Sequence, residues 1–446
     1  MTASFGTKVM SVTVSLLLSS ALSATAPSAL AATEPPAAPA PIVLDPLPAS
    51  SGTAPTAAGV QTAIGSLVAR QLKGSSVLVV DPASGQVLLD QRGSRARIPA
   101  STVKLATAAA ALDVLGAATT LPTIAYRDGD TVYLVGSGDP TLARSGQGDP
   151  AKGGRPSLKA LASAVAADYG VQRAVTVVYD ASAFDGPGLG PGWSSSFPKA
   201  GVVAPVSALV VDSGRVSPGA RSRVQNPAKQ AAELFSSYLR SDGLKVKRTK
   251  RGPLDRGAAE IARVESASIG DIVQHMLTDS ENDYAEALAH LVGGKALGQP
   301  SFAGGAEATV ASLARLGVDT SGVTLVDGSG LSRQNRVPPA TWADLLTDVV
   351  TGTNATLVPI SAGLPIAGLT GTLADRFGSR ATKAGRGFVH AKTGTLTGVV
   401  SLAGTVLDAD GRILVFAMTD DKARSLAKVR ETMDTVASRL AACGCG

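Results

Sequence analysis

Apolar residues recur with helical spacing in several parts of the chain, and short apolar or alternating runs lie between them. The helical spacing predicts helices over residues 60–72, 101–115, 269–277, 284–291, 302–316 and 423–442. The shorter runs predict strands over residues 76–80, 86–89, 388–393, 399–407 and 413–418. Because helices and strands from both ends of the chain can pack together, we expect one α/β (α+β) domain that is split in sequence.

The middle of the chain has a different character. Short β-like runs at residues 132–135 and 174–178 lie among many Gly, Pro and Ser. We interpret residues 121–262 as a mostly β inserted region, one or more domains, and residues 59–120 and 263–446 as the discontinuous domain around it. A chain of 446 residues fits this division, because one hydrophobic core rarely grows beyond about 250–300 residues.

The first residues carry an export signal. Lys8 precedes an apolar stretch over residues 9–22, and Ala29-Leu30-Ala31 fits a small-x-small cleavage site. We therefore predict a signal peptide over residues 1–31, an Ala/Pro-rich linker over residues 32–58, and an extracytoplasmic protein, secreted or associated with the cell envelope. Retention of the segment as a membrane anchor is the alternative, which its short length disfavours.

Composition narrows the function classes. The chain is 44% hydrophobic but 4% aromatic and carries a formal net charge of +6. The cations are scattered and lack interleaved aromatic residues, so we expect no nucleic-acid partner. The basic cluster over residues 245–251 is interpreted as a solvated strand or loop rather than a binding patch.

Neither a metal nor another cofactor is expected. The three histidines are dispersed, and no zinc-ligand spacing accompanies them. Cys443 and Cys445 lie in the terminal Cys-Gly-Cys-Gly, where they cannot cross-link the body of the protein. An unpaired tail is favoured there over a local or intermolecular disulfide.

Three short motifs occur in one order: Ser101-x-x-Lys104, Ser280-x-Asn282 and Lys392-Thr393-Gly394. Two further Ser-x-x-Lys matches, at residues 196–199 and 425–428, show that this pattern alone has little value. Ser101 opens a predicted helix, whose first turn offers unpaired N–H groups. By contrast, Pro198 disfavours a helical Phe197, and Ser425 is predicted to lie inside the terminal helix, so neither should have a usable first turn.

The first motif suits an activated nucleophile. Residues three apart on a helix share a face, so Lys104 can reach the Ser101 hydroxyl and act as its base. A Ser-His-Asp triad is disfavoured, because the histidines are dispersed and no Gly-x-Ser-x-Gly occurs. Lys104 must then be neutral at working pH, which a desolvated site and a second cation, Lys392, would promote.

The other two motifs can complete the site. Ser280 can relay a proton to the leaving amine and Asn282 can hold the peptide amide, although a helix N-cap is the simpler reading of that segment alone. Lys392 and Thr393 offer a carboxylate site on a strand edge, and Gly394 permits close backbone approach. The N–H groups of Ser101 and Thr395 can form an oxyanion hole.

This ordered set resembles the low-molecular-mass class C penicillin-binding proteins, which are D-alanyl-D-alanine carboxypeptidases and endopeptidases. Further family-like stretches lie at residues 136–142, 180–193, 204–209 and 327–333. The resemblance implies a β-lactamase/transpeptidase-like serine enzyme domain split by an insertion between the first two motifs. It also implies that Ser101 is acylated by peptidoglycan stem peptides ending in D-Ala-D-Ala and by β-lactam antibiotics, with Ser280 as proton relay. Substrate contacts are implied for Asn282, Lys392, Thr393 and Thr395, and further stem contacts for Arg333 and Leu396.

Three alternatives stay open at this point. A class A β-lactamase would need a Glu-x-x-Leu-Asn element, and the sequence contains none. A non-catalytic wall-binding or penicillin-sensing protein would have no need of an activated nucleophile. An esterase with a Ser-Lys dyad would differ only in its substrate.

Overall fold

The computed structural model describes residues 52–146 and 155–446. The predicted signal peptide and most of the predicted linker lie outside the described residues. Within the described ranges, no helix is long and apolar enough to cross a membrane.

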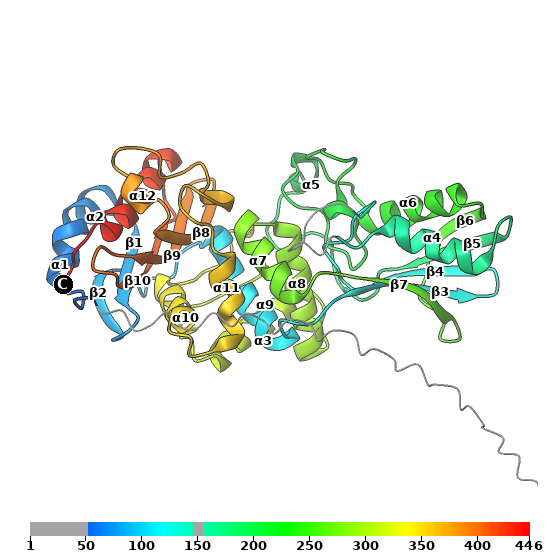
Figure 1. The fold of residues 1–446 in the computed structure, drawn as a ribbon, viewed down its shortest axis with the longest axis horizontal. Helices are drawn as coiled ribbons and strands as arrows, with labels where there is room; N and C mark the ends of the chain where they lie inside the picture. The colour runs from blue at the N-terminus through cyan, green and yellow to red at the C-terminus, as the bar shows by residue number, and fades with distance from the viewer. Residues whose placement is uncertain (1–51, 147–154) are drawn as a thin grey trace, which may run out of the picture. The chain divides into compact units, whose positions relative to one another are not determined.

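Strands from both ends of the chain form one antiparallel sheet in the order β2-β1-β10-β9-β8 (Figure 1). The strands are β1 (Ser76–Asp81), β2 (Gln86–Gln91), β8 (Val389–Leu396), β9 (Val399–Leu407) and β10 (Ile413–Asp420). The register pairs Val79 of β1 with Phe416 of β10. This pairing confirms that a split α/β domain joins the two chain ends.

Both faces of this first sheet are buried, because alternate β1 residues enter different cores. Leu78 and Val80 belong to one core and Val77 and Val79 to the other. The first core receives α3 (Val103–Leu115), α7 (Ile269–Asp279), α8 (Asn282–Leu297), α9 (Phe302–Arg315), α10 (Pro339–Thr351) and α11 (Val358–Gly363). The second receives α1 (Ala57–Val60), α2 (Ser66–Gln71), the π-helical turn Gln61–Gly65 between them, and α12 (Leu426–Ala441).

A second sheet, with its own core, comes from the middle of the chain in the order β6-β5-β4-β3-β7. Its strands are β3 (Pro122–Asp128), β4 (Thr131–Gly136), β5 (Ala174–Asp180), β6 (Lys245–Arg251) and β7 (Ala259–Glu265). Two helices, α4 (Leu158–Tyr169) and α6 (Pro227–Ser241), pack on it, so this region is more helical than the sequence indicated. The limits of residues 121–262 for the insertion stay a prediction.

The basic cluster of residues 245–251 forms the edge strand β6, and its cations are exposed. Charged side chains on an edge strand prevent pairing with another chain. The interpretation as a solvated strand is therefore sufficient for this cluster.

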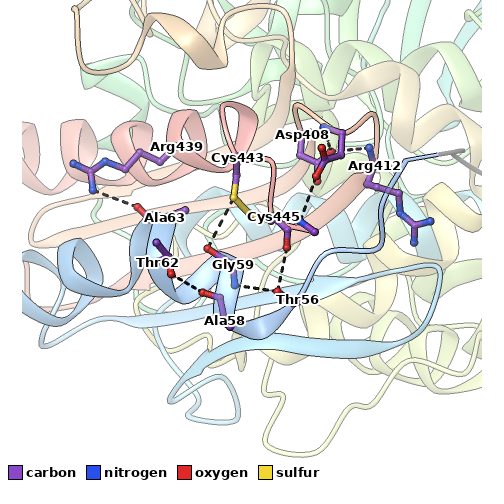
Figure 2. The surroundings of a disulfide bond; sticks show 12 residues. Thr56, Ala58, Gly59, Thr62, Ala63, Asp408, Arg412, Arg439, Cys443 and Cys445 are labelled. Carbon is purple, nitrogen blue, oxygen red and sulfur yellow. Dashed lines mark hydrogen bonds between the residues drawn. A yellow bond between two sulfur atoms is a disulfide. The ribbon is translucent and has the colours of Figure 1, made fainter.

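The C-terminal tail is folded back against the first helix (Figure 2). Cys443 and Cys445 form a local disulfide, and the Thr56 N–H donates to the Cys445 carbonyl over 2.7 Å. Cys445 is fully buried and belongs to the second core. The favoured sequence interpretation, an unpaired tail, is therefore replaced by a paired and packed one.

Candidate active site

Ser101 lies in a 3-10 turn, Ala100–Thr102, that leads directly into α3. The turn is held against two glycines. A Cβ atom at Gly330 would lie 1.9 Å from the Ala100 carbonyl oxygen, and one at Gly394 would lie 3.0 Å from the Ser101 nitrogen. Ala100 itself has a φ of 50°, which an L-residue adopts only under constraint from its surroundings. The close approach that Gly394 permits is therefore to the chain around Ser101.

Lys104 is fully buried one turn further along, and its ammonium group has three hydrogen-bond acceptors. Nζ lies 3.4 Å from Ser101 Oγ, 2.7 Å from Asn282 Oδ1 and 2.8 Å from the Ser329 carbonyl oxygen. Burial lowers the Lys104 pKa to about 8, although nearby carboxylates, chiefly Glu286, partly oppose this. A large fraction of Lys104 is thus neutral at mildly alkaline pH and can accept a proton.

The second motif occupies the junction of α7 and α8. Ser280 ends α7 in the left-handed conformation, with φ 59°, and Asn282 begins α8. Asn282 bridges two parts of the chain, because its amide oxygen accepts from Lys104 and its Nδ2 donates to the Val202 carbonyl over 2.9 Å. The segment does form the N-terminus of α8, but its N-cap is Glu281, which makes no side-chain capping hydrogen bond, so neither Ser280 nor Asn282 is used as the cap.

Ser280 lies two residues before Asn282, at the C-cap of α7. Among the described residues its hydroxyl has no hydrogen-bond partner. A cavity of about 330 Å³ opens beside this motif, lined in part by Glu281, His275 and Tyr284. The Ser280 side chain is therefore not committed to a structural hydrogen bond.

The third motif lies on β8, the edge strand of the first sheet. β9 pairs with one side of β8, and on the other side a single bridge between His390 and Ile366 covers the first half. Within the described chain, no strand pairs with the second half of that free side, which carries residues 392–396. Thr395 is exposed, whereas Thr393 is buried and shares a hydrogen bond of 2.8 Å with the Thr372 hydroxyl. An extended peptide therefore has an open strand edge beside Ser101.

Lys392 is fully buried, and its Nζ donates to the Thr393 carbonyl over 3.2 Å. Burial lowers the Lys392 pKa well below its usual value, and the charge of Lys104 lowers it further. The sequence predicted that Lys392 would help to lower the Lys104 pKa. The pKa of Lys104 is instead lowered by burial, and the repulsion between the two lysines lowers the pKa of Lys392. A bound carboxylate would favour the charged form of this buried lysine.

Several groups near Lys104 were not found from the sequence. The Ser329 carbonyl belongs to a loop that Asp327 organises by accepting from the N–H groups of Gly330 and Ser332. Trp193 Nε1 donates to the same Asp327 carboxylate over 2.8 Å. In the sequence, residues 327–333 and 180–193 had only been identified as family-like stretches, and this gave no role to Asp327, to Trp193 or to a backbone carbonyl.

The two other Ser-x-x-Lys matches need a correction. Ser425 is the N-cap of α12 and accepts from the Lys428 N–H, so it does have a helical first turn. Phe197 is helical too, because it begins the short helix α5 (Phe197–Ala200). Both matches are disqualified for a different reason, since their serine and lysine side chains are exposed and lack the burial that makes Lys104 basic.

No group of three or more His, Cys, Asp or Glu in the described ranges is placed to hold a metal ion. The arrangement supports nucleophilic attack by Ser101 with Lys104 as its base, next to an open strand edge and the buried Lys392. Together with the helices on the five-stranded sheet, these features define a serine hydrolase of the β-lactamase/transpeptidase class.

The comparisons with known proteins give the family. A profile of the D-Ala-D-Ala carboxypeptidase 3 (S13) family matches residues 64–223 and 218–442, and the chain belongs to this family. Carboxypeptidase DacB of Mycolicibacterium smegmatis is 35% identical over 453 aligned positions, which cover 99% of this chain and 97% of that protein. The D-alanyl-D-alanine carboxypeptidase of an Actinomadura species is 32% identical, covering 82% and 81%.

Solved structures agree on the fold. Penicillin-binding protein 4 from Haemophilus influenzae superposes with a TM-score of 0.72 at 23% identity, covering 84% of this chain and 98% of that one. The resemblance to low-molecular-mass class C penicillin-binding proteins is therefore confirmed. By its family, the protein is a serine-type D-alanyl-D-alanine carboxypeptidase.

Proposed function

We propose that the carboxypeptidase reaction passes through an acyl-enzyme on Ser101. The observation that carries the proposal is the set of three contacts of Lys104 Nζ. A neutral amine has two N–H donors and one lone pair. When Asn282 and the Ser329 carbonyl accept the two hydrogens, the lone pair faces the Ser101 hydroxyl.

Acylation then follows from these positions. Lys104 removes the hydroxyl proton as Ser101 Oγ attacks the carbonyl of the penultimate D-alanine, and the N–H groups of Ser101 and Thr395 stabilise the oxyanion. The C–N bond breaks, the proton reaches the leaving D-alanine amine through Ser280, and water later hydrolyses the ester. Ser280 suits this relay because its hydroxyl has no structural partner within the described chain.

The substrate end is recognised beside the nucleophile. The open half of β8 pairs with the stem peptide, and Asn282 holds its amide. Lys392, with the hydroxyls of Thr393 and Thr395, binds the terminal carboxylate. Binding of this anion would favour the charged form of a lysine that is fully buried and whose Nζ donates to the Thr393 carbonyl.

The same site suits β-lactams, whose strained amide would acylate Ser101 and whose carboxylate would occupy the Lys392 site. Penicillin-binding protein 4 of H. influenzae has been solved in complex with a β-lactam, which supports this extension. Cross-linked stems, as substrates of an endopeptidase activity, would bind the same edge. An extracytoplasmic location belongs to the proposal, because peptidoglycan lies outside the cytoplasm.

Labelling with a fluorescent penicillin, followed by assay of D-alanine release from a pentapeptide, tests the proposal. The wild type should be labelled and release many D-alanine molecules per protein, whereas Ser101→Ala should do neither. Ser425→Ala is the matched control, because it removes the serine of an exposed Ser-x-x-Lys, and it should behave as the wild type. A labelled Ser101→Ala variant would refute the assignment. Release that stops at one D-alanine per protein would instead indicate a non-catalytic binder, and rapid penicillin turnover a β-lactamase.

A further inference from the structure

A buried carboxylate lies behind Lys104 that the proposed mechanism does not use. Glu286 is on α8, one turn after Asn282, and its side chain is fully shielded from solvent. Its two oxygens accept separate backbone donors, from the Gly328 nitrogen over 3.0 Å and the Ser329 nitrogen over 2.7 Å. A buried carboxylate is expensive to keep without such donors, so Glu286 and this loop fix one another.

The loop held by Glu286 is the one that contacts the base. The Ser329 carbonyl oxygen accepts from Lys104 Nζ over 2.8 Å. The preceding carbonyl, of Gly328, accepts from the Thr107 hydroxyl over 2.6 Å. Helix α3, which carries Lys104 and Thr107 and directly follows the turn with Ser101, is thus joined to helix α8 through two consecutive loop residues.

The direction of the Lys104 lone pair depends on this connection. The amine can rotate about its terminal carbon–nitrogen bond unless both of its hydrogens have fixed acceptors. Asn282 supplies one acceptor from the start of α8, and the Ser329 carbonyl supplies the other. If that carbonyl shifts, the lone pair is no longer held toward Ser101 Oγ, and proton transfer loses its geometry.

We propose that Glu286 is a positioning residue for Lys104, acting through the Ser329 carbonyl. The inference rests on the proposed role of Lys104 as the base. Glu286 touches neither Ser101 nor the substrate edge. Its contribution is to hold the second acceptor of the amine in place.

The charges around the two groups give this role a signature of its own. Carboxylates of Glu286, Asp327, Glu281 and Asp283 raise the Lys104 pKa against its burial, and Glu286 has the largest effect. Burial and the neighbouring Asp327 raise the pKa of Glu286 itself to about 8. Glu286 carries its charge mainly above pH 8, where that charge helps to keep Lys104 protonated. Loss of the charge should therefore lower the pH at which acylation levels off, in addition to slowing acylation.

The test measures penicillin acylation in Glu286→Gln, which keeps the side-chain volume but removes the charge and one acceptor. Rates are normalised to the fraction of protein that a prolonged penicillin exposure labels, so that misfolded protein is not counted. Asp180→Asn is the control, because Asp180 is also buried and accepts two backbone N–H groups, from Ser182 and Leu254, but lies on β5. We expect the acylation rate of Glu286→Gln to fall on the order of 10- to 100-fold, while the affinity for penicillin before acylation stays unchanged. The midpoint of its pH–rate profile should lie at lower pH than in the wild type. Asp180→Asn should match the wild type in its acylation rate and in the midpoint of its pH–rate profile.

Thr107→Val keeps the test decisive if Glu286→Gln does not fold. This substitution removes the second anchor of the loop without changing charge, so acylation should slow while the midpoint stays. The positioning role would be overturned if Thr107→Val were acylated at the wild-type rate. It would also be overturned if folded Glu286→Gln kept both the wild-type rate and the wild-type pH–rate profile. Failure of the Ser101 proposal is distinguishable, because it would appear as penicillin labelling of Ser101→Ala.

Discussion

The backbone at Gly330 lies so close to Ala100 that a Cβ atom on Gly330 would be 1.9 Å from the Ala100 carbonyl oxygen. Gly330 also has a φ of 83°, in the region that L-residues rarely adopt. The loop that supplies the Ser329 carbonyl to Lys104 therefore also supports the turn that carries Ser101. Two consecutive residues of this loop, Ser329 and Gly330, thus position the base Lys104 and the nucleophile Ser101.

Gly330→Ala should disable the enzyme more than it destabilises it. The added methyl must push the Ala100 peptide away, which costs about 1–3 kcal/mol of stability and displaces Ser101. Gly317→Ala is the control, because Gly317 has a φ of 88° and nothing within 4 Å of its Cβ position. It should lose only about 1 kcal/mol, from backbone strain, and keep wild-type acylation. Thermal unfolding gives the stability of the two variants, and penicillin acylation rates give their activity. Full activity in Gly330→Ala would contradict the packing argument.

Acylation should rise with pH in the wild type. Burial holds the Lys104 pKa near 8, so the neutral base is the minor form at pH 6 and the major form at pH 9. The second-order rate constant for penicillin should therefore increase about tenfold per pH unit well below 8 and level off above it. Stopped-flow or quench measurements on one penicillin across this range give the profile. A flat profile would exclude Lys104 as the titrating base.

Lys392 should act on binding of the substrate carboxylate. Lys392→Met keeps most of the buried volume but removes the cation, and a charge-assisted hydrogen bond is worth about 1.5–3 kcal/mol. We expect KM for a D-Ala-D-Ala peptide to rise on the order of 10- to 100-fold, with a smaller change in kcat. The matched measurement uses the same peptide with a C-terminal amide. Wild type should strongly prefer the acid, and the variant should not, so an unchanged acid-to-amide ratio would refute the carboxylate site.

Local sequence patterns predicted those parts of the site that depend on local structure. Ser101 and Lys104 are three residues apart on one helical turn, so their contact follows from helix geometry. The Glu286–Ser329 contact spans 43 residues and depends on how α8 packs against a loop, which no periodicity encodes. The correction at Ser425 has a related cause, because the Ala423–Ala442 pattern fitted a helix that in fact begins at Leu426.

Helix α4 shows the same limit in the fold. Its apolar positions, including Leu158, Leu161 and Val165, do have helical spacing, and all three are buried on the second sheet. The helix was not predicted because the surrounding region is rich in Gly, Pro and Ser, which favoured a β and loop interpretation. The β strands on either side were recognised, since β-branched runs such as β5 carry their signal within a few residues.

The packing of the C-terminal tail against the first helix gives a prediction about stability alone. A Cβ atom at Gly59 of α1 would lie 2.4 Å from the Cys445 carbonyl oxygen, which in turn accepts from the Thr56 N–H. Alanine is otherwise favoured over glycine in a helix by about 1 kcal/mol, so without the tail Gly59→Ala should stabilise the protein. With the tail in place, the clash must displace a fully buried residue, and we expect a net loss of about 1–3 kcal/mol.

The control for this prediction is Gly74→Ala, whose Cβ position has nothing within 4 Å. That substitution should raise stability by about 0.4–1 kcal/mol, because alanine lowers the conformational entropy of the unfolded chain. Denaturant unfolding of the two variants should thus move the midpoint in opposite directions, while penicillin labelling of Ser101 stays at the wild-type level in both. A midpoint for Gly59→Ala at or above the wild type would mean that the tail does not pack against α1 in solution, because only that contact reverses the helical preference for alanine.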